Sequence, residues 1–198
     1  LVPDEWAVPL LGHHNRLNIA LALVALRAAG LNDAAVRAGI ETFRGLPGRL
    51  EFLGEYKGVK VYNDNNATTP DATIAALRAL GDDRKTNQKN IVLIMGGDDK
   101  NLDMSALLAE IPRFCSSVVL FKERGTERIR NEVFAMQKDG IGVSEGEGLV
   151  PTVDRAFSIA KPGDIILYSP AFTSFGKYFN NEYDRNDQFV EAVKNVTA

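Results

Sequence analysis

The chain has 198 residues, 45% of them hydrophobic and 25% charged, a composition that fits a folded globular protein of one or two domains and excludes disordered and collagen-like classes. Lys and Arg number 23 against 26 Asp and Glu, for a formal net charge of -3 at pH 7. Without a basic excess, nonspecific binding to nucleic acid or to an anionic membrane has no electrostatic drive. We therefore expect no nucleic-acid partner and no membrane partner.

The scarcity of cysteine and histidine excludes a zinc cluster. Cys115 is the lone cysteine, and the histidines are the adjacent His13 and His14. The longest uninterrupted apolar run, residues 19–26, is far shorter than the roughly 20 residues that cross a bilayer. The chain begins at Leu1, without an initiator Met or the layout of a signal peptide. We expect a reducing, cytoplasmic setting and a start that lies within a longer protein.

Two helical patterns open the chain. From Asn15 to Ala29 apolar residues recur every three or four positions, and Gly30 follows where a left-handed cap is favoured. Asn32 is a typical N-cap for a second helix that runs to about Phe43. The segment 45–48 then breaks the periodicity with glycine and proline. We expect a helical hairpin over residues 1–45, too small to bury a core alone, and a second domain over 46–198. The apolar positions of the first helix are Leu17, Leu21, Val24 and Ala28.

Residues 46–198 alternate strand and helix patterns, which is typical of a doubly wound α/β domain with a mostly parallel, Rossmann-like sheet. The runs Ile91–Met95 and Ile165–Leu167 are apolar on both faces, as parallel strands between two helix layers must be. Thr69-Pro70-Asp71 starts a helix with a capping residue, a first-turn proline and an acid. The expected strands are 59–62, 90–95, 117–121, 141–143 and 164–168, and the expected helices are 69–81, 104–111, 126–134, 150–160 and 184–196.

Ligands of such sheets bind beyond the carboxyl ends of the strands, so we expect chemistry in the loops that follow them. The loop 63–70 places Asp64, amides and hydroxyls before a helix N-terminus, where a ribose, a cation or an anion could bind. A capped turn explains the same residues without a ligand. Arg49, beside the domain boundary, is either a phosphate ligand or a solvated surface residue.

Two further loops carry distinctive residues. The loop Gly96-Gly97-Asp98-Asp99-Lys100 combines glycines that permit close backbone approach with a mobile cation for a carboxylate or phosphate, and a plain turn is the alternative. It matches neither the P-loop nor the dinucleotide fingerprint. The loop 169–175 gathers serine and threonine hydroxyls. Because the histidines belong to the other segment, a hydroxyl clamp for a carboxylate is favoured over a nucleophilic serine, with helix capping as the alternative.

Five short motifs follow one another across essentially the whole chain. They are His14-Asn15-Arg16-Leu17-Asn18, Gly45-Leu46-Pro47-Gly48-Arg49-Leu50-Glu51, Tyr62-Asn63-Asp64 with Ala67-Thr68, Gly96-Gly97-Asp98 with Lys100, and Ser169-Pro170-Ala171 with Ser174-Phe175. Each motif is weak alone, but in this order they resemble the Mur ligases of peptidoglycan synthesis. The last motif is most similar to the family member that adds D-glutamate to UDP-N-acetylmuramoyl-L-alanine.

The resemblance implies ATP-dependent, ADP-forming amide ligation through an acyl phosphate, with catalysis by positioning and charge neutralisation. It implies that residues 1–45 are the last helices of a central ATPase domain and that 46–198 are the C-terminal domain that admits the amino acid. The implied nucleotide-binding residues are His14, Asn15, Asn18, Arg49 and Asp64. The implied D-glutamate-binding residues are Thr68, Lys100, Ser174 and Phe179, with Lys100 as the catalytic cation.

The resemblance also implies ATP and Mg²⁺ as cofactors, with the metal ligands mostly outside this chain and no metal site of its own. No Gly-x-x-Gly-Lys-Ser/Thr phosphate loop occurs in the sequence. We therefore expect this chain alone to be inactive, although the full-length protein would be a ligase. We expect the protein to be a monomer.

Two departures from the family pattern bear on the substrate. Asn66 stands where many D-glutamate-adding members have lysine, so a positive charge on the substrate side is absent. The stretch from Phe175 to Tyr183 is slightly longer than usual, so the aromatic wall is either Phe179 or Tyr183. A related ligase, such as the folate-polyglutamate enzymes, and a non-enzymatic nucleotide-binding module are the alternative functions.

Overall fold

The computed structural model describes residues 2–81 and 89–197. The chain divides into two compact units, Leu1–Leu46 and Pro47–Ala198. Within the described ranges, no helix is long and apolar enough to cross a membrane.

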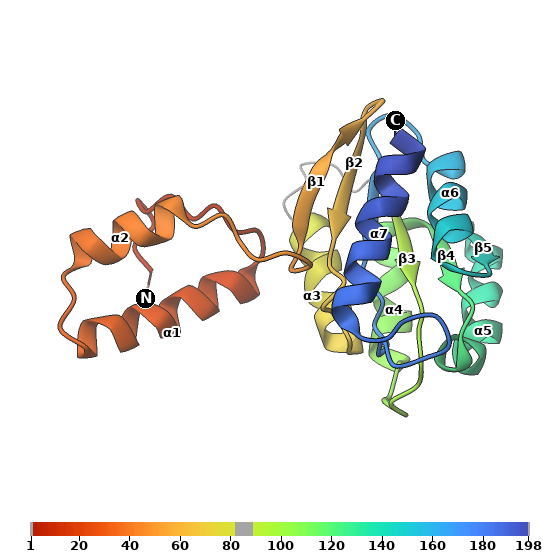
Figure 1. Cartoon of the computed structure of the whole chain (residues 1–198), viewed down its shortest axis with the longest axis horizontal. Helices are drawn as coiled ribbons and strands as arrows, with labels where there is room; N and C mark the ends of the chain where they lie inside the picture. The colour runs from red at the N-terminus through yellow and green to blue at the C-terminus, as the bar shows by residue number, and fades with distance from the viewer. Residues whose placement is uncertain (1, 82–88, 198) are drawn as a thin grey trace. The chain divides into compact units, whose positions relative to one another are not determined.

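The first unit is the expected helical hairpin, formed by α1 (His13–Ala28) and α2 (Asp33–Thr42) (Figure 1). The Asn32 side chain caps α2 by accepting a hydrogen bond from the Ala35 N–H at 2.9 Å. A small cluster of Trp6, Leu23 and Val36 is buried. The apolar residues that indicated α1 lie outside this cluster, and Leu21 is 71% exposed. Among the described residues, α1 therefore carries an exposed apolar stripe.

The second unit is built on a six-stranded sheet of order β1-β2-β6-β3-β4-β5. β1 pairs with β2 antiparallel, and the remaining pairs are parallel, which confirms the doubly wound, mostly parallel fold class. The predicted strands appear at or within a few residues of their expected positions. The strands are β1 (Glu51–Tyr56), β2 (Val59–Asn63), β3 (Ile91–Met95), β4 (Cys115–Phe121), β5 (Gly142–Gly146) and β6 (Ile165–Tyr168).

The edge strand β1 is absent from the strands that the sequence pattern predicts. It pairs with β2 through a tight turn in which Lys57 and Gly58 have φ values of 52° and 80°. A two-residue hairpin turn with positive φ at both positions is usually formed by Asn-Gly or Asp-Gly. Lysine at the first position seldom indicates such a turn, so the sequence did not predict it. Gly54 sits at an irregularity in the pairing, which further weakens the strand pattern in the sequence.

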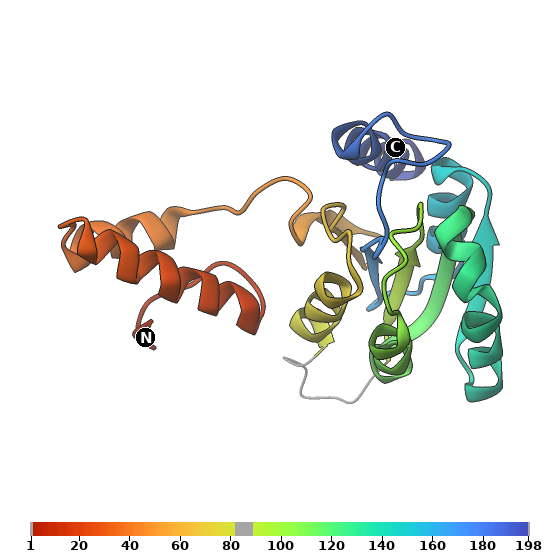
Figure 2. The same cartoon turned by 90° about the horizontal axis from the view of Figure 1, so that it is seen from below.

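Helices cover both faces of the sheet (Figures 1 and 2). One hydrophobic cluster joins α3, α4 and α5 to one face, and a second joins α6 and α7 to the other. Alternate residues of β3 divide between the clusters, with Leu93 in the first and Val92 and Ile94 in the second. The helices are α3 (Pro70–Gly81), α4 (Ser105–Phe114), α5 (Arg124–Ala135), the short 3₁₀ helix η1 (Met136–Asp139), α6 (Leu149–Ile159) and α7 (Glu182–Thr197).

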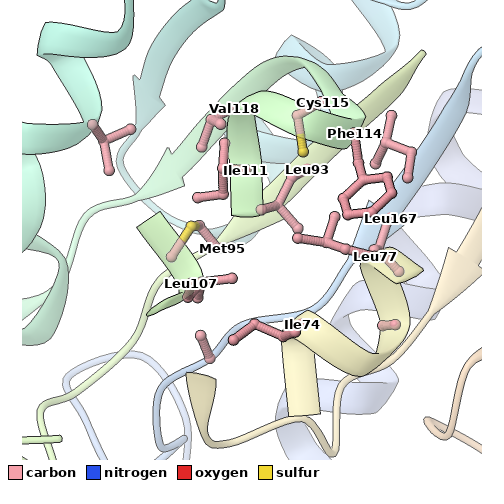
Figure 3. Packing of buried hydrophobic residues seen from close by; sticks show 14 of the residues in the cluster. Ile74, Leu77, Leu93, Met95, Leu107, Ile111, Phe114, Cys115, Val118 and Leu167 are labelled. Atoms are coloured by element: carbon pink, nitrogen blue, oxygen red, sulfur yellow. The ribbon is translucent and has the colours of Figure 1, made fainter. Parts of the chain in front are cut away.

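The core of the first face is centred on β3. Figure 3 shows Leu93 beside Phe114 of α4 and Leu167 of β6, with Leu77 of α3 close by. These side chains are almost completely removed from water. The packing fixes β3 and β6 at the middle of the sheet, and with them the loops that follow both strands.

We expect Leu93→Ala to lower the free energy of unfolding by about 2–5 kcal/mol, because it empties a fully buried position and leaves a cavity. Val150→Ala, at a half-exposed position of α6, should change it by less than about 0.5 kcal/mol. Denaturant unfolding followed by circular dichroism measures both. Equal losses in the two variants would contradict this placement of the core.

Candidate functional site

Three loops meet at the carboxyl edge of the sheet because β6 lies between β2 and β3. Asp64 N–H donates to the Tyr168 carbonyl at 2.7 Å, joining the loop after β2 to the end of β6. Gly96 N–H donates to the Pro170 carbonyl at 2.9 Å, joining the loop after β3 to the loop after β6. The main chain alone therefore gathers the segments 64–69, 96–101 and 169–175, as the parallel topology requires.

Close backbone approach explains one glycine of the loop after β3. Gly97 has φ 153°, and a Cβ there would lie 2.6 Å from the Thr173 carbonyl oxygen. The next residue, Asp98, exchanges backbone hydrogen bonds of 3.1 and 3.2 Å with Thr173. A side chain at position 97 would separate these two loops. The bridge places the segment that carries Ser174 alongside the segment that carries Lys100.

Lys100 and Thr68 are in direct contact. The Lys100 ammonium donates to the Thr68 hydroxyl at 2.9 Å and to the Thr68 carbonyl at 3.2 Å. Both acceptors are neutral, and Lys100 has no ion pair within residues 2–81 and 89–197. The site therefore holds an unneutralised ammonium beside a hydroxyl, an arrangement that suits a carboxylate or phosphate ligand. Ser174 is buried next to the Asp98–Thr173 bridge.

The two candidate aromatic residues have different environments. Phe179 is 8% exposed and belongs to the hydrophobic cluster under α6 and α7, with its ring centroid 5.4 Å from that of Phe121. Tyr183, in the first turn of α7, is 74% exposed. The packing of Phe179 is that of a core residue, and Tyr183 is the more accessible of the two rings. A contact of either with substrate stays a prediction.

Asp64 is buried, and both of its oxygens are occupied within the protein. Oδ1 accepts from the Leu50 N–H at 3.0 Å, and Oδ2 accepts from the Ser169 hydroxyl at 2.9 Å. Ser169 Oγ also lies 2.9 Å from the Thr73 hydroxyl oxygen. Burial raises the pKa of Asp64 to about 6, against the opposing effects of the Ser169 hydroxyl, the Leu50 N–H and the charge of Arg49.

Arg49 is exposed beside this cluster, while the remaining predicted nucleotide ligands belong to the first unit. His14, Asn15 and Asn18 all lie on α1. Burial, and next the neighbouring His13, lower the pKa of His14. The Asn15 side-chain amide donates to the Leu11 carbonyl at 2.8 Å. The predicted nucleotide residues thus divide between the two units, Arg49 and Asp64 being in the second, and their common role stays a prediction.

Sequence reasoning missed Arg185, a fully buried arginine at the start of α7. Its guanidinium donates to Asn65 Oδ1 at 2.8 Å, to the Asn65 carbonyl at 2.7 Å and to the Phe172 carbonyl at 3.1 Å. It therefore joins the loop after β2 to the loop after β6. The spacing could have indicated its burial, because residue 185 lies four positions before the buried Phe189 and therefore on the same face of the helix.

The described residues offer no metal centre of their own. Among them, no group of three or more His, Cys, Asp or Glu side chains is arranged to hold a metal ion.

Comparison with known proteins gives a family and a set of relatives. The family model described as "Mur ligase, glutamate ligase domain" matches residues 48–172. The UDP-N-acetylmuramoylalanine–D-glutamate ligase of Lacticaseibacillus paracasei is 34% identical over 98% of this chain and 39% of its own length. The enzyme of the same name from Borreliella afzelii is 40% identical over 78% of this chain and 32% of its own length. The chain thus spans well under half the length of these curated relatives.

Two solved structures share the fold. The UDP-N-acetylmuramate-alanine ligase of Thermotoga maritima superposes with a TM-score of 0.66 at 19% identity, over 95% of this chain and 39% of that one. Escherichia coli FolC in complex with ADP superposes with a TM-score of 0.68 at 21% identity, over 98% of this chain and 43% of that one. At these identities the likeness concerns the fold alone.

The raised pKa of Asp64 predicts how stability changes with pH. The folded pKa of about 6 exceeds 3.8, the ordinary value that holds in the unfolded chain. The protonated Asp64 therefore stabilises the fold fully below the unfolded pKa, and this stabilisation is lost as pH rises through about 6. Asp64→Asn keeps an acceptor for the Leu50 N–H and has no proton to lose. The free energy of unfolding of wild type relative to this variant should fall by about 2–3 kcal/mol from about pH 3.5 to about pH 7.5.

Denaturant unfolding of both proteins across this range tests the prediction, since the other carboxylates cancel in the difference. Asp139→Asn, at an exposed position, is the matched control. A difference between wild type and Asp64→Asn that does not vary with pH would show that Asp64 ionises normally in the fold.

Proposed function

Because this chain belongs to the Mur ligase family, we propose that it forms the amino-acid-binding part of an ATP-dependent ligase that joins D-glutamate to UDP-N-acetylmuramoyl-L-alanine in peptidoglycan precursor synthesis. The match to the family's glutamate ligase domain and the names of the relatives at 34% and 40% identity support this assignment. The single observation that carries the proposed chemistry is that, within residues 2–81 and 89–197, the Lys100 ammonium donates to the neutral oxygens of Thr68 and forms no ion pair.

In this proposal Lys100 binds a carboxylate of D-glutamate. A carboxylate is a stronger acceptor for an ammonium than a hydroxyl or a carbonyl, so the substrate displaces weak contacts rather than an ion pair. Thr68 then donates its hydroxyl to the bound carboxylate, and Ser174 supplies a further hydroxyl from the adjoining loop. The clamp orients the glutamate amine toward the acyl group, and catalysis by this chain is positioning.

The bond-forming step follows from the family's chemistry. The carboxyl group of the UDP-linked acceptor is first phosphorylated by ATP, with release of ADP. The amine of glutamate then attacks the acyl phosphate, the C–N bond forms, and inorganic phosphate leaves with the bonding electrons while the amine loses a proton. We assign Arg49 to the phosphate charge and Asp64, with His14, Asn15 and Asn18, to the nucleoside of ATP. Mg²⁺, held mostly by residues that do not belong to this chain, would neutralise further phosphate charge.

We assign residues 1–45 to the last helices of the family's central ATPase domain. The exposed apolar stripe of α1 supports this, since Leu17, Leu21 and Val24 are too exposed to belong to the core of a self-sufficient unit. The second domain, from residue 46, carries the amino-acid site.

We expect Lys100→Ala in the full-length protein to raise the glutamate KM roughly ten- to a hundredfold, because it removes a charge-assisted hydrogen bond. The ATP KM should change far less, and Ser174→Ala should act in the same direction more weakly. Steady-state kinetics with D-glutamate and ATP varied in turn measure the effects. Lys161→Ala removes an exposed lysine before β6, away from the carboxyl edge, and is the matched control.

The choice of amino acid is tested in the same assay with D-glutamate, L-glutamate and a neutral amino acid. Preference for D-glutamate supports the proposed member of the family. Preference for L-glutamate would favour a polyglutamate-adding ligase, and an unchanged glutamate KM in Lys100→Ala would refute the assigned site.

We also expect the 198-residue chain alone to hydrolyse no ATP. Its sequence holds no Gly-x-x-Gly-Lys-Ser/Thr phosphate loop, and each missing electrostatic element removes several kcal/mol of transition-state stabilisation. A phosphate-release assay with MgATP, using the full-length enzyme as the positive control, measures this. Turnover above the buffer blank would place ATP chemistry within this chain and contradict the assignment.

A further inference from the structure

Helix α5 presents two arginines to the two aspartates that precede Lys100. Arg124 donates to the two oxygens of Asp98 at 2.9 and 3.1 Å. Arg128, one turn later, donates to the two oxygens of Asp99 at 2.9 and 3.0 Å and to the Leu102 carbonyl at 2.8 Å. Both pairs are therefore bidentate, and Arg128 fixes the loop on both sides of Lys100.

In the sequence Asp98-Asp99-Lys100, two aspartate carboxylates could compete with a substrate carboxylate for the lysine ammonium. Asp98 and Asp99 directly precede Lys100 in the sequence, and an unpaired carboxylate this close along the chain would attract the Lys100 ammonium. In the structure each carboxylate is occupied by a guanidinium, and the Lys100 ammonium lies instead on Thr68. The ammonium consequently has no anion of its own among the described residues.

We propose that Arg128, assisted by Arg124, is a positioning residue that occupies the carboxylate beside Lys100 and thereby keeps the Lys100 ammonium available for a carboxylate of the substrate. The inference rests on the proposed role of Lys100 as the glutamate-binding cation. It assigns the two arginines of α5 to substrate recognition rather than to folding.

The ionisation of Asp99 agrees with this role. Burial opposes the charged form, but hydrogen bonds from the Arg128 side chain and the Asn101 N–H, with the charges of Arg128 and Arg124, hold the pKa of Asp99 below its usual value. Asp99 therefore remains a full anion at neutral pH. Loss of Arg128 would leave that anion beside Lys100 without its partner.

The experiment compares Arg128→Ala, Asp99→Asn and the double variant in the full-length enzyme. Arg128→Ala should raise the glutamate KM about five- to tenfold, because the released carboxylate now competes for Lys100. Asp99→Asn alone should stay within about twofold of wild type, since its amide oxygen still accepts the Asn101 N–H. The double variant should return to within about twofold of wild type, because no free carboxylate remains.

Arg130→Ala is the matched control. Arg130 lies on the same helix, forms a bidentate pair with Glu145 at 2.8 and 3.1 Å, and is 38% exposed against 35% for Arg128. This variant should leave the glutamate KM unchanged. Melting temperatures of the variants should agree within a few degrees, since partly exposed ion pairs add little stability.

The double variant separates this inference from a merely structural role. If Arg128 only braced the loop, the double variant would be as impaired as Arg128→Ala, and that result would overturn the proposal. An unchanged glutamate KM in Arg128→Ala, together with a raised one in Lys100→Ala, would also overturn it while leaving the proposed function intact. An unchanged KM in Lys100→Ala would remove the proposed function itself.

Discussion

The candidate site depends on one constraint, the parallel pairing of β6 with β2 on one side and β3 on the other. That order brings three loops, far apart in the sequence, to one edge of the sheet. The two faces are filled by helices, so polar side chains of these segments have only that edge to occupy. Backbone bonds such as Asp64 N–H to the Tyr168 carbonyl then set the spacing of the loops before any side chain contributes.

Two arginines hold these loops in different ways, Arg185 through buried hydrogen bonds and Arg128 through a partly exposed ion pair. Arg185 is fully buried, and its guanidinium donates to an amide oxygen and two carbonyls. Burial lowers its pKa, with the charge of Glu182 opposing that effect. Removing it would leave buried acceptors unsatisfied, so its role is bound to the fold. Arg128 is partly exposed, and its pair with Asp99 adds little to stability. In the role proposed above, Arg128 pairs with Asp99 and so leaves the Lys100 ammonium available for the substrate.

The electrostatic outcome at this edge favours an anionic ligand. Asp98 and Asp99 are paired with guanidinium groups, and burial raises the pKa of Asp64 to about 6. Within the described ranges, neither Lys100 nor Arg49 forms a salt bridge with a carboxylate, although the charge of Arg49 acts on Asp64. The chain as a whole carries a net charge of -3, so the positive character is local to these loops. A basic ligand would find the paired carboxylates already occupied.

Local chemistry made much of this protein readable from sequence: the Asn32 cap, the proline-led start of α3 and the doubly apolar run of β3 identify their elements, and five motifs in order indicated the Mur ligase family. Each capping, proline or strand signal and each single motif consists of neighbouring residues, and the order of the motifs is given by the sequence itself, so no tertiary information is needed to detect them. The tertiary structure alone decided the hairpin strand β1, the Lys100–Thr68 contact, the burial of Arg185 and the pairing of Arg128 with Asp99. β1 pairs with its neighbour in sequence, but its turn uses Lys57 and its pairing is irregular near Gly54, so the local pattern is weak. The other three contacts depend on which strands and helices become neighbours, and parallel pairing joins segments whose separation along the chain carries no local signature.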